Sequence, residues 1–423
     1  MSKAVRRAPF SDNPRVGVRG QRTQQRILDA ALQAFAEEGY HACSVERITK
    51  LARCSRVAFY QYFASKEEVI GYLAAQVARQ VDASTEALDP IGPDIAGWAA
   101  LRAWVGRYGE IHARYEPVFH AFQTDEALFA AGTPAGEQMV ANVHARVVAT
   151  PLAPRHLDPL IRVLLETVTH TLDVVSVLRG ALPTACPSDR VHDALADVLH
   201  RTLFGVSDGV NARTFDGVPM PPIEFGDAMR ELLGEDDHPA SDGGALGALL
   251  AAGHEVFVAR GYHETRVDDV VAAAGVSHGA FYRYFANKGE LARILTARAL
   301  RALGPMLVEL PDVLADDTAG GTPAVRRWLR RYHAARADEV AMFRVWVDGA
   351  IQDPTLRADY APPLDWGRRR MARYLRPRGF GDVEMDGVVM VALLGVFGAR
   401  ERPTDEIDAA AQIIEHGLLG RVT

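Results

Sequence analysis

One fourteen-residue motif occurs twice in this chain, and this duplication constrains the fold more than any other feature. Residues 55–68 read SRVAFYQYFASKEE and residues 277–290 read SHGAFYRYFANKGE, so the second copy follows the first by 222 positions without a gap. Solenoid repeats have periods of roughly 20–50 residues, which is far shorter. The spacing therefore predicts that a whole domain has been duplicated.

Each copy of the motif belongs to the same pattern of three helices, a longer one followed by two short ones. Apolar residues first recur at three- and four-residue steps, and Gly39 or Gly261 ends that helix. In the first copy Ser44 can cap a second, shorter helix, and a third begins at Ser55 or Ser277. Two short helices joined by a tight turn after a longer supporting helix are typical of a helix-turn-helix.

The similarity continues beyond these modules. Trp104 and Tyr108 correspond to Trp328 and Tyr332 at an offset of 224, and both surroundings have helical periodicity. A stretch rich in Gly, Pro and Asp separates the halves. We therefore predict an all-α fold with two tandem units. The expected domains are a flexible basic arm at 1–20, a helix-turn-helix domain at 21–70, a helical regulatory domain at 71–205, a linker at 206–243, a second helix-turn-helix domain at 244–292 and a second regulatory domain at 293–423.

Composition argues against several classes of protein. Of the 423 residues, 48% are hydrophobic and 24% are charged, which is typical of a globular protein. The longest apolar run, residues 388–397, is too short to span a membrane, and the basic start has no apolar region typical of a secretory signal. The three cysteines and fourteen histidines have no metal-ligand spacing, and no catalytic motif occurs. We expect no cofactor, no metal, no enzymatic activity and a cytoplasmic location at the nucleoid.

The distribution of charge matters more than its sum. A net charge of −7 would usually argue against a nucleic-acid partner, but the first seventy or so residues are locally rich in Arg and Lys. The basic arm is then either a solvated tail or a segment that touches DNA.

Residues 39–68 and 261–291 closely follow the pattern G-Y-x-x-x-[ST]-V-x-x-I…S-x-x-x-[FL]-Y-x-[YH]-F-x-[SN]-K-x-x-L, which resembles the TetR family of bacterial transcription regulators. The resemblance implies an N-terminal DNA-binding domain joined to a helical domain that binds an inducer and dimerises. We expect a ligand-responsive repressor that binds an imperfectly palindromic operator in double-stranded DNA. The alternative is a ligand-binding or protein-interaction module in which one or both DNA-binding copies have decayed.

The two third helices are the expected base readers. A recognition helix presents small or polar side chains to base edges at its N-terminal end and keeps aromatic residues behind for packing. The resemblance adds phosphate contacts by capping serines, by tyrosines that could instead belong to the core or its rim, and by a lysine. The predicted DNA-contacting residues are Arg22, Ser44, Ser55, Arg56, Val57, Ala58, Tyr60, Gln61, Tyr62, Lys66, Ser277, His278, Gly279, Ala280, Tyr282, Arg283, Tyr284 and Lys288.

The two copies differ in charge and in their turns. Gly244 stands where the first copy has Arg22, so the second copy is expected to hold DNA phosphates less strongly. Arg53 stands where the second copy has Gly275. If this turn needs a left-handed residue, Arg53 costs roughly 1 kcal/mol, or else the turn shifts.

Homodimers of the TetR family pair through their last two helices. The corresponding segments here are 156–179 with 190–204 and 382–399 with 404–419, so we expect them to pack within one chain as an intramolecular pseudo-dimer. Such chains could act alone or as a dimer. A small apolar or aromatic inducer is expected among the middle helices. The candidate residues, each of which could instead be plain core, are Tyr108, His112, Phe119, Phe122, Tyr332, Phe343, Arg344 and Trp346.

Overall fold

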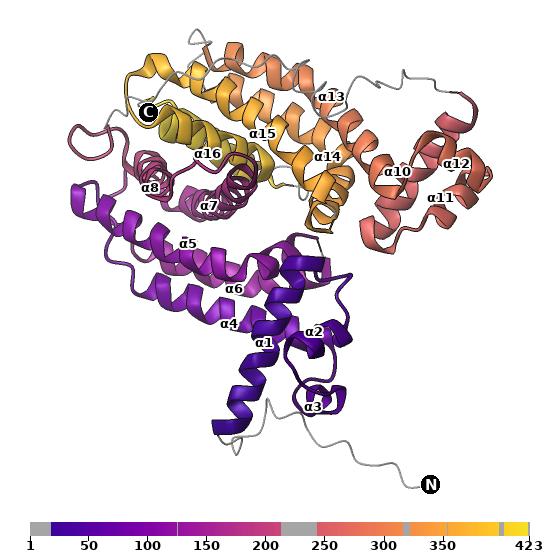
Figure 1. Ribbon diagram of the computed structural model, residues 1–423. Helices are drawn as coiled ribbons and strands as arrows, with labels where there is room; N and C mark the ends of the chain where they lie inside the picture. Colours follow the sequence, from indigo (N-terminus) through magenta and orange to yellow (C-terminus); the bar gives the residue numbers. More distant parts are fainter. Residues whose placement is uncertain are drawn as a thin grey trace. The chain divides into compact units, whose positions relative to one another are not determined.

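The computed structural model describes residues 18–124, 126–212, 243–315, 322–352, 354–396 and 402–421. In these ranges the chain is helical almost throughout and contains no named strand, only an isolated bridge between Ile91 and Val147 (Figure 1). The predicted all-α fold is confirmed. Most of the basic arm and of the linker lies outside the described residues.

The chain forms two compact units. The first comprises Met1–Val81 and Ile111–Ala135, and the second comprises Asp82–Glu110 and Gly136–Thr423. The first helix-turn-helix module therefore belongs to the first unit. The second module belongs to the second unit, together with the terminal helices of both halves.

The first module consists of α1 (Val18–Glu38), α2 (Val45–Leu51), α3 (Arg56–Tyr62) and the start of α4 (Lys66–Glu86). Its core is a cluster of apolar side chains that are at most 1% exposed: Ile27, Phe35, Ile48, Phe59 and Phe63. Gly39 has a φ of 75°, which only glycine adopts readily, and it ends α1 as predicted.

The second module repeats this arrangement with α10 (Gly244–Glu264), α11 (Val267–Ala274), α12 (His278–Tyr284) and the start of α13 (Lys288–Ala315). Gly261 interrupts the end of α10 with a φ of 72°, at the position equivalent to Gly39. Phe257, Phe281 and Phe285 are at most 1% exposed and form the equivalent core.

The turn before the third helix has the same backbone in both copies. Gly275 has a φ of 64° and Arg53 a φ of 49°, so both are left-handed. The turn has not shifted to accommodate the arginine, and Arg53 carries the backbone strain that Gly275 avoids.

The remaining helices form two sets, one in each half of the chain. The first half, up to residue 205, contributes α5 (Ile95–Thr124), α6 (Glu126–His144), α7 (Pro154–Ala181) and α8 (Ser188–Phe204). The second half, from residue 244, contributes α14 (Thr322–Gln352), α15 (Pro354–Leu375), η2 (Arg376–Arg378), α16 (Val383–Val396), α17 (Thr404–Gln412) and η3 (Ile413–Leu418).

A tryptophan–tyrosine stack marks the duplication inside these helices. The rings of Trp104 and Tyr108 lie 5.4 Å apart, and those of Trp328 and Tyr332 lie 4.9 Å apart. All four side chains are buried. The same packing unit therefore occurs in α5 and in α14, as the offset of 224 predicts.

The terminal helices of the two halves contact each other in the second unit. Helix α7 packs on α15, α16 and α17, and α8 packs on α16 and η3, and Figure 1 shows α7 and α8 beside α16. The helices that were predicted to pair within one chain are in contact.

This contact is polarised. The first half supplies arginines and the second supplies carboxylates: Arg190 Nε lies 2.7 Å from Asp382, Arg201 Nη2 lies 3.2 Å from Asp386, and Arg162 Nε lies 3.5 Å from Glu406. One pair, Arg402 with Glu166 at 2.5 Å, has the opposite sense.

Arg201 occupies the centre of this contact and is fully buried. Its guanidinium donates to the carbonyl oxygens of Gly417 (2.7 Å) and Asn211 (3.1 Å) and to the carboxylate of Asp386. Arg378 bonds to the same carboxylate. Burial lowers the pKa of Arg201 to about 10, so it remains charged at neutral pH. A buried charge of this kind is tolerated only because its partner is present.

Candidate nucleic-acid interface

Helix α3 presents a small exposed face. Ser55 caps the helix, since its hydroxyl accepts a hydrogen bond from the Ala58 backbone N–H at 3.1 Å. Behind the face, Phe59 is buried, whereas Val57 is 72% exposed and Tyr60 is 49% exposed. Arg56 is also exposed. A side chain of this length at the first turn of an exposed helix can reach base edges in a major groove.

Exposed cations flank this face in the sequence. Arg22 and Arg26 are exposed on α1, Lys50 is exposed on α2, and Arg53 is exposed in the turn. Arg47 differs, because its guanidinium pairs with Glu37 and, at 2.6 Å, with Glu38. Counting Arg56, the described residues of the first module carry five exposed cations and four exposed acids (Asp29, Glu37, Glu46 and Glu67), a small positive excess.

Helix α12 presents a different set of side chains. Ser277 caps it by accepting from the Ala280 backbone N–H at 3.2 Å. His278 and Arg283 are exposed, and Tyr282 is 58% exposed. The His278 ring lies 3.4 Å from the carboxylate of Asp268. The first module has the same arrangement, since Glu46 lies 3.9 Å from the Arg56 guanidinium at the equivalent positions.

One ion pair has exchanged its charges between the modules. Glu38 at the end of α1 pairs with Arg47 on α2, and at the equivalent positions Arg260 on α10 pairs with Asp269 on α11 at 2.6 Å. The Arg266 backbone N–H and the Arg260 guanidinium hold the pKa of Asp269 below its usual value. The ion pair between the first and second helices is retained. On the second helix, however, Asp269 stands where the first module has Arg47.

The two predicted phosphate-binding lysines have a structural role that the sequence did not reveal. Lys66 Nζ donates to the carbonyl oxygens of Tyr40 (3.0 Å), His41 (2.7 Å) and Cys43 (3.2 Å). Lys288 repeats this with three carbonyls of the equivalent loop, at 2.6–3.3 Å. An ammonium group has three donors, and both lysines use them to hold the loop before α2 or α11. Their contact with phosphate stays a prediction.

Burial limits two other residues that were expected to contact DNA. Tyr62 is only 8% exposed and packs in the core, which favours the core interpretation over the phosphate contact. Tyr284 is half-buried. Ser44 is exposed and caps α2 by accepting from the Arg47 N–H at 3.1 Å, whereas Arg266 stands at the equivalent position of the second copy.

A family model described as "Bacterial regulatory proteins, tetR family" matches residues 27–73 and 249–294. These ranges cover both helix-turn-helix modules from within the first helix to the start of the fourth. The chain carries two TetR-family modules in tandem. The family match thus confirms the resemblance seen in the repeated motif.

Individual relatives match parts of the chain. The "HTH-type transcriptional activator FasR" of Mycolicibacterium smegmatis is 49% identical over 45 residues, 11% of this chain and 20% of that protein. YuxN of Bacillus subtilis, an uncharacterized regulator of the same type, is 46% identical over 44 residues, 10% of this chain and 15% of that protein. Mb2936c of Mycobacterium bovis, also an uncharacterized regulator, is 27% identical over 170 residues, 39% of this chain and 86% of that protein. The chain thus covers a fifth or less of the first two relatives.

The predicted inducer-contacting residues of the TetR-type halves are mostly buried. The Tyr108 hydroxyl lies 2.7 Å from Thr169 Oγ1, and burial raises its pKa to about 12. Tyr332 and Phe343 are buried, and the buried Trp346 donates to the Leu356 carbonyl at 3.3 Å. These contacts suit the core alternative.

The other inducer candidates add little to this description. In the first unit the His112 and Phe119 rings lie 4.7 Å apart, and Phe122 is half-buried. The Arg344 side chain lies outside the described residues.

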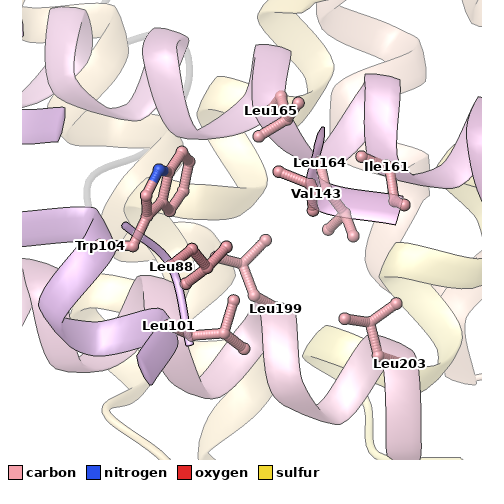
Figure 2. A pocket seen from close by; sticks show the side chains of 9 residues that line it. All are labelled: Leu88, Leu101, Trp104, Val143, Ile161, Leu164, Leu165, Leu199 and Leu203. Carbon is pink, nitrogen blue, oxygen red and sulfur yellow. The ribbon is translucent and has the colours of Figure 1, made fainter. Parts of the chain in front are cut away.

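A small cavity lies beside Trp104. Its volume is about 20 Å³, enough for about one water molecule, whereas pockets for organic ligands usually measure roughly 300–1,000 Å³. Figure 2 shows the aliphatic side chains that surround it. An inducer would fit here only after the surrounding helices moved apart. The lining residues are Leu88, Leu101, Trp104, Val143, Ile161, Leu164, Leu165, Leu199 and Leu203.

Other kinds of site were sought among the described residues. No described helix has the length and apolarity that a bilayer span requires, and no described group of three or more His, Cys, Asp or Glu side chains is arranged to hold a metal. Burial raises the pKa of the Cys43 thiol to about 11 and also raises that of Cys54. Both thiols are therefore protonated at neutral pH and poorly nucleophilic.

Proposed function

We propose that this chain is a DNA-binding transcription regulator, a repressor that a small molecule releases from its operator. A single chain would supply both DNA-binding modules, and the packing of α7 and α8 on α15–α17 and η3 would replace the interface of a homodimer. Release would follow if the ligand bound better to a conformation in which the two reading helices no longer matched the DNA.

The observation that carries this proposal is the exposed face of α3 and its surroundings. Arg56, Val57 and Tyr60 are exposed at the start of a capped helix that follows a tight turn. Exposed cations on α1, on α2 and in the turn supply phosphate contacts in a chain whose net charge is −7. Positive charge gathered on one module of an acidic protein is what binding to a polyanion requires.

The experiment measures binding of the full chain to the DNA upstream of its own gene as a function of salt. Each phosphate contact contributes about 0.9 to the slope of log affinity against log salt concentration. Arg22→Gln is expected to weaken binding and to reduce that slope by about 0.9. Arg327→Gln, an exposed arginine outside both modules, is the matched control and should change neither. Binding that is absent, or that does not fall with salt, contradicts the proposal.

The operator is proposed to be an imperfect palindrome. At equivalent positions α3 carries Arg56 and Gln61 whereas α12 carries His278 and Arg283, so the two half-sites would present different base edges. Footprinting by one chain on a strict palindrome would contradict this asymmetry.

A second candidate function follows from the low positive charge of the second module. Helix α10 has Gly244 and Ala248 in place of two arginines, and α11 has Asp269 in place of Arg47. In this alternative the second module no longer reads DNA and serves as a ligand-binding or protein-interaction part. A footprint restricted to one half-site would favour it.

A further inference from the structure

A cationic pocket lies at the end of α15, away from the residues that were predicted to contact DNA. It has a volume of about 620 Å³ and lies between α13, the α15–η2 segment and the end of the chain. Of the described lining residues, four are arginines and none is acidic: Pro311, Arg370, Arg373, Tyr374, Leu375, Pro377, Arg378, Leu419 and Arg421.

Two of these arginines already have carboxylate partners. Arg378 bonds to Asp386, and Arg421 Nη1 donates to Glu415 at 2.8 Å. Both guanidinium groups also donate to backbone carbonyls, of Leu418 and Leu314. These bonds hold both side chains in the pocket wall. Because the carboxylates balance their charges, the two arginines add little net charge to the pocket.

The other two arginines leave their charge unbalanced. Arg370 Nη2 donates to the Val308 carbonyl at 2.6 Å, but its Nε is buried without a hydrogen-bond partner among the described residues. Arg373 is exposed, and no described carboxylate pairs with it. The two lie three residues apart on one helix, a spacing that places side chains on the same face. The pocket thus carries about two positive charges that no carboxylate in the described part of the chain balances.

The remaining walls are apolar. Pro311, Pro377, Leu375 and Leu419 provide hydrocarbon surface, and Tyr374 provides a ring. Guanidinium groups bind carboxylates and phosphates through paired, parallel hydrogen bonds, and pockets of this volume suit a small organic molecule. Charge and walls together define a ligand with a dianionic head and an apolar or aromatic body.

We propose that this pocket binds a small aromatic dianion, either an aryl phosphate or an aromatic dicarboxylate. The dianion balances Arg370 and Arg373 and places its ring against the Pro and Leu walls. This site is independent of the proposed DNA binding, because it lies in other residues and its occupancy is measured without DNA.

The test is calorimetric titration of the full chain, at fixed physiological salt, with two probes. Phenyl phosphate represents the aryl phosphates and isophthalate the dicarboxylates, so the probe that binds more tightly identifies the source of the dianion. Arg373→Gln and Arg370→Gln are each expected to weaken that probe by about tenfold or more, the loss of a charge-assisted hydrogen-bonded pair. Phenol, which lacks the charge, should bind at least tenfold more weakly.

Two controls keep the result specific. Arg327→Gln removes an exposed arginine outside the pocket, and Arg56→Gln removes one from the DNA-reading face, and both should retain wild-type probe affinity within about twofold. Equal thermal midpoints of all four variants would show that folding is unchanged. The proposal is overturned if neither probe binds at millimolar concentration, if phenol binds as well as phenyl phosphate, or if Arg56→Gln abolishes binding while Arg373→Gln preserves it.

Discussion

In the first half of the chain a glutamate on the first helix holds an arginine on the second, and in the second half an arginine holds an aspartate at the same two positions. The helices and the turn around these pairs are otherwise alike. The exchange preserved the contact between the two helices. It reversed the sign of the charge at the paired position, which is positive in α2 and negative in α11. The surface charge has therefore diverged between the two modules while the fold has been retained.

The contact between the two halves teaches the same lesson. An interface between identical subunits is symmetric, so each arginine–carboxylate pair would occur twice, once in each direction. Here Arg190 and Arg201 of one half face Asp382 and Asp386 of the other. Joining the halves in one chain removed the symmetry requirement and allowed each half to specialise.

The largest expected effect is a loss of stability on substitution at the centre of the contact between the two halves. Asp386→Asn removes the carboxylate that two buried guanidinium groups share, Arg201 and Arg378, and should cost about 3–5 kcal/mol in the free energy of unfolding. Urea unfolding of the full chain measures it. The matched control is Asp189→Asn, whose side chain is 90% exposed beside Arg102, and we expect a change below about 0.5 kcal/mol. A loss below about 1 kcal/mol at Asp386 would mean that the polarised contact is incidental.

The next effect separates the two reading helices. Arg56→Ala should weaken operator binding by about 1–3 kcal/mol, roughly 5- to 150-fold, because a bidentate contact with guanine is lost. His278→Ala should change it less than about threefold, since an imidazole cannot make the bidentate contact of a guanidinium. Fluorescence anisotropy on one duplex at one salt concentration measures both. Equal losses at the two positions would remove the functional difference between the modules.

A smaller effect comes from the turn. Arg53→Gly should stabilise the chain by about 1 kcal/mol, because glycine adopts a φ of 49° without the strain of a side chain. Gly275→Ala, the reverse kind of change at a φ of 64°, should destabilise it by a similar amount. Both are measured by thermal unfolding without DNA. If Arg53→Gly does not stabilise the chain and Gly275→Ala does not destabilise it, the two turns accept a side chain without strain.

The smallest effect concerns the exchanged ion pair. Arg47→Asp alone should lower the free energy of unfolding by about 0.5 kcal/mol, as expected for a partly exposed pair. Adding Glu38→Arg recreates the arrangement of the second module and should restore most of the loss, a coupling that a double-mutant cycle measures. If the double variant is no more stable than the single one, the two pairs are not equivalent.

Much of the fold could be predicted because its signals are local. The caps at Ser44, Ser55 and Ser277 and the left-handed Gly39 follow from short-range hydrogen bonds and sterics, and the structure has each of them. The duplication added information, because each copy checked the other. The sequence left undecided whether Arg53 has a left-handed backbone, and the structure shows that it does.

The remaining features depend on residues that are distant in the sequence. Arg201 and Asp386 are 185 positions apart, and no local pattern shows that they meet. The arginine-rich run from Arg368 to Arg378 looks like one basic stretch, yet Arg368 pairs with Asp365 while Arg373 has no described acidic partner. Burial of Tyr62 was equally invisible, since a tyrosine beside a core phenylalanine can face either way.

The loop before the second helix has one further consequence. Three converging carbonyl oxygens grip the ammonium of Lys66, and three more grip that of Lys288, much as a crown ether holds an ammonium ion. A guanidinium is flat and cannot direct three hydrogens to one such tripod of oxygens. At these two positions lysine and arginine are therefore not exchangeable, although both carry the same charge. The host is the peptide backbone itself, so the selectivity for the smaller cation persists whatever side chains the loop carries.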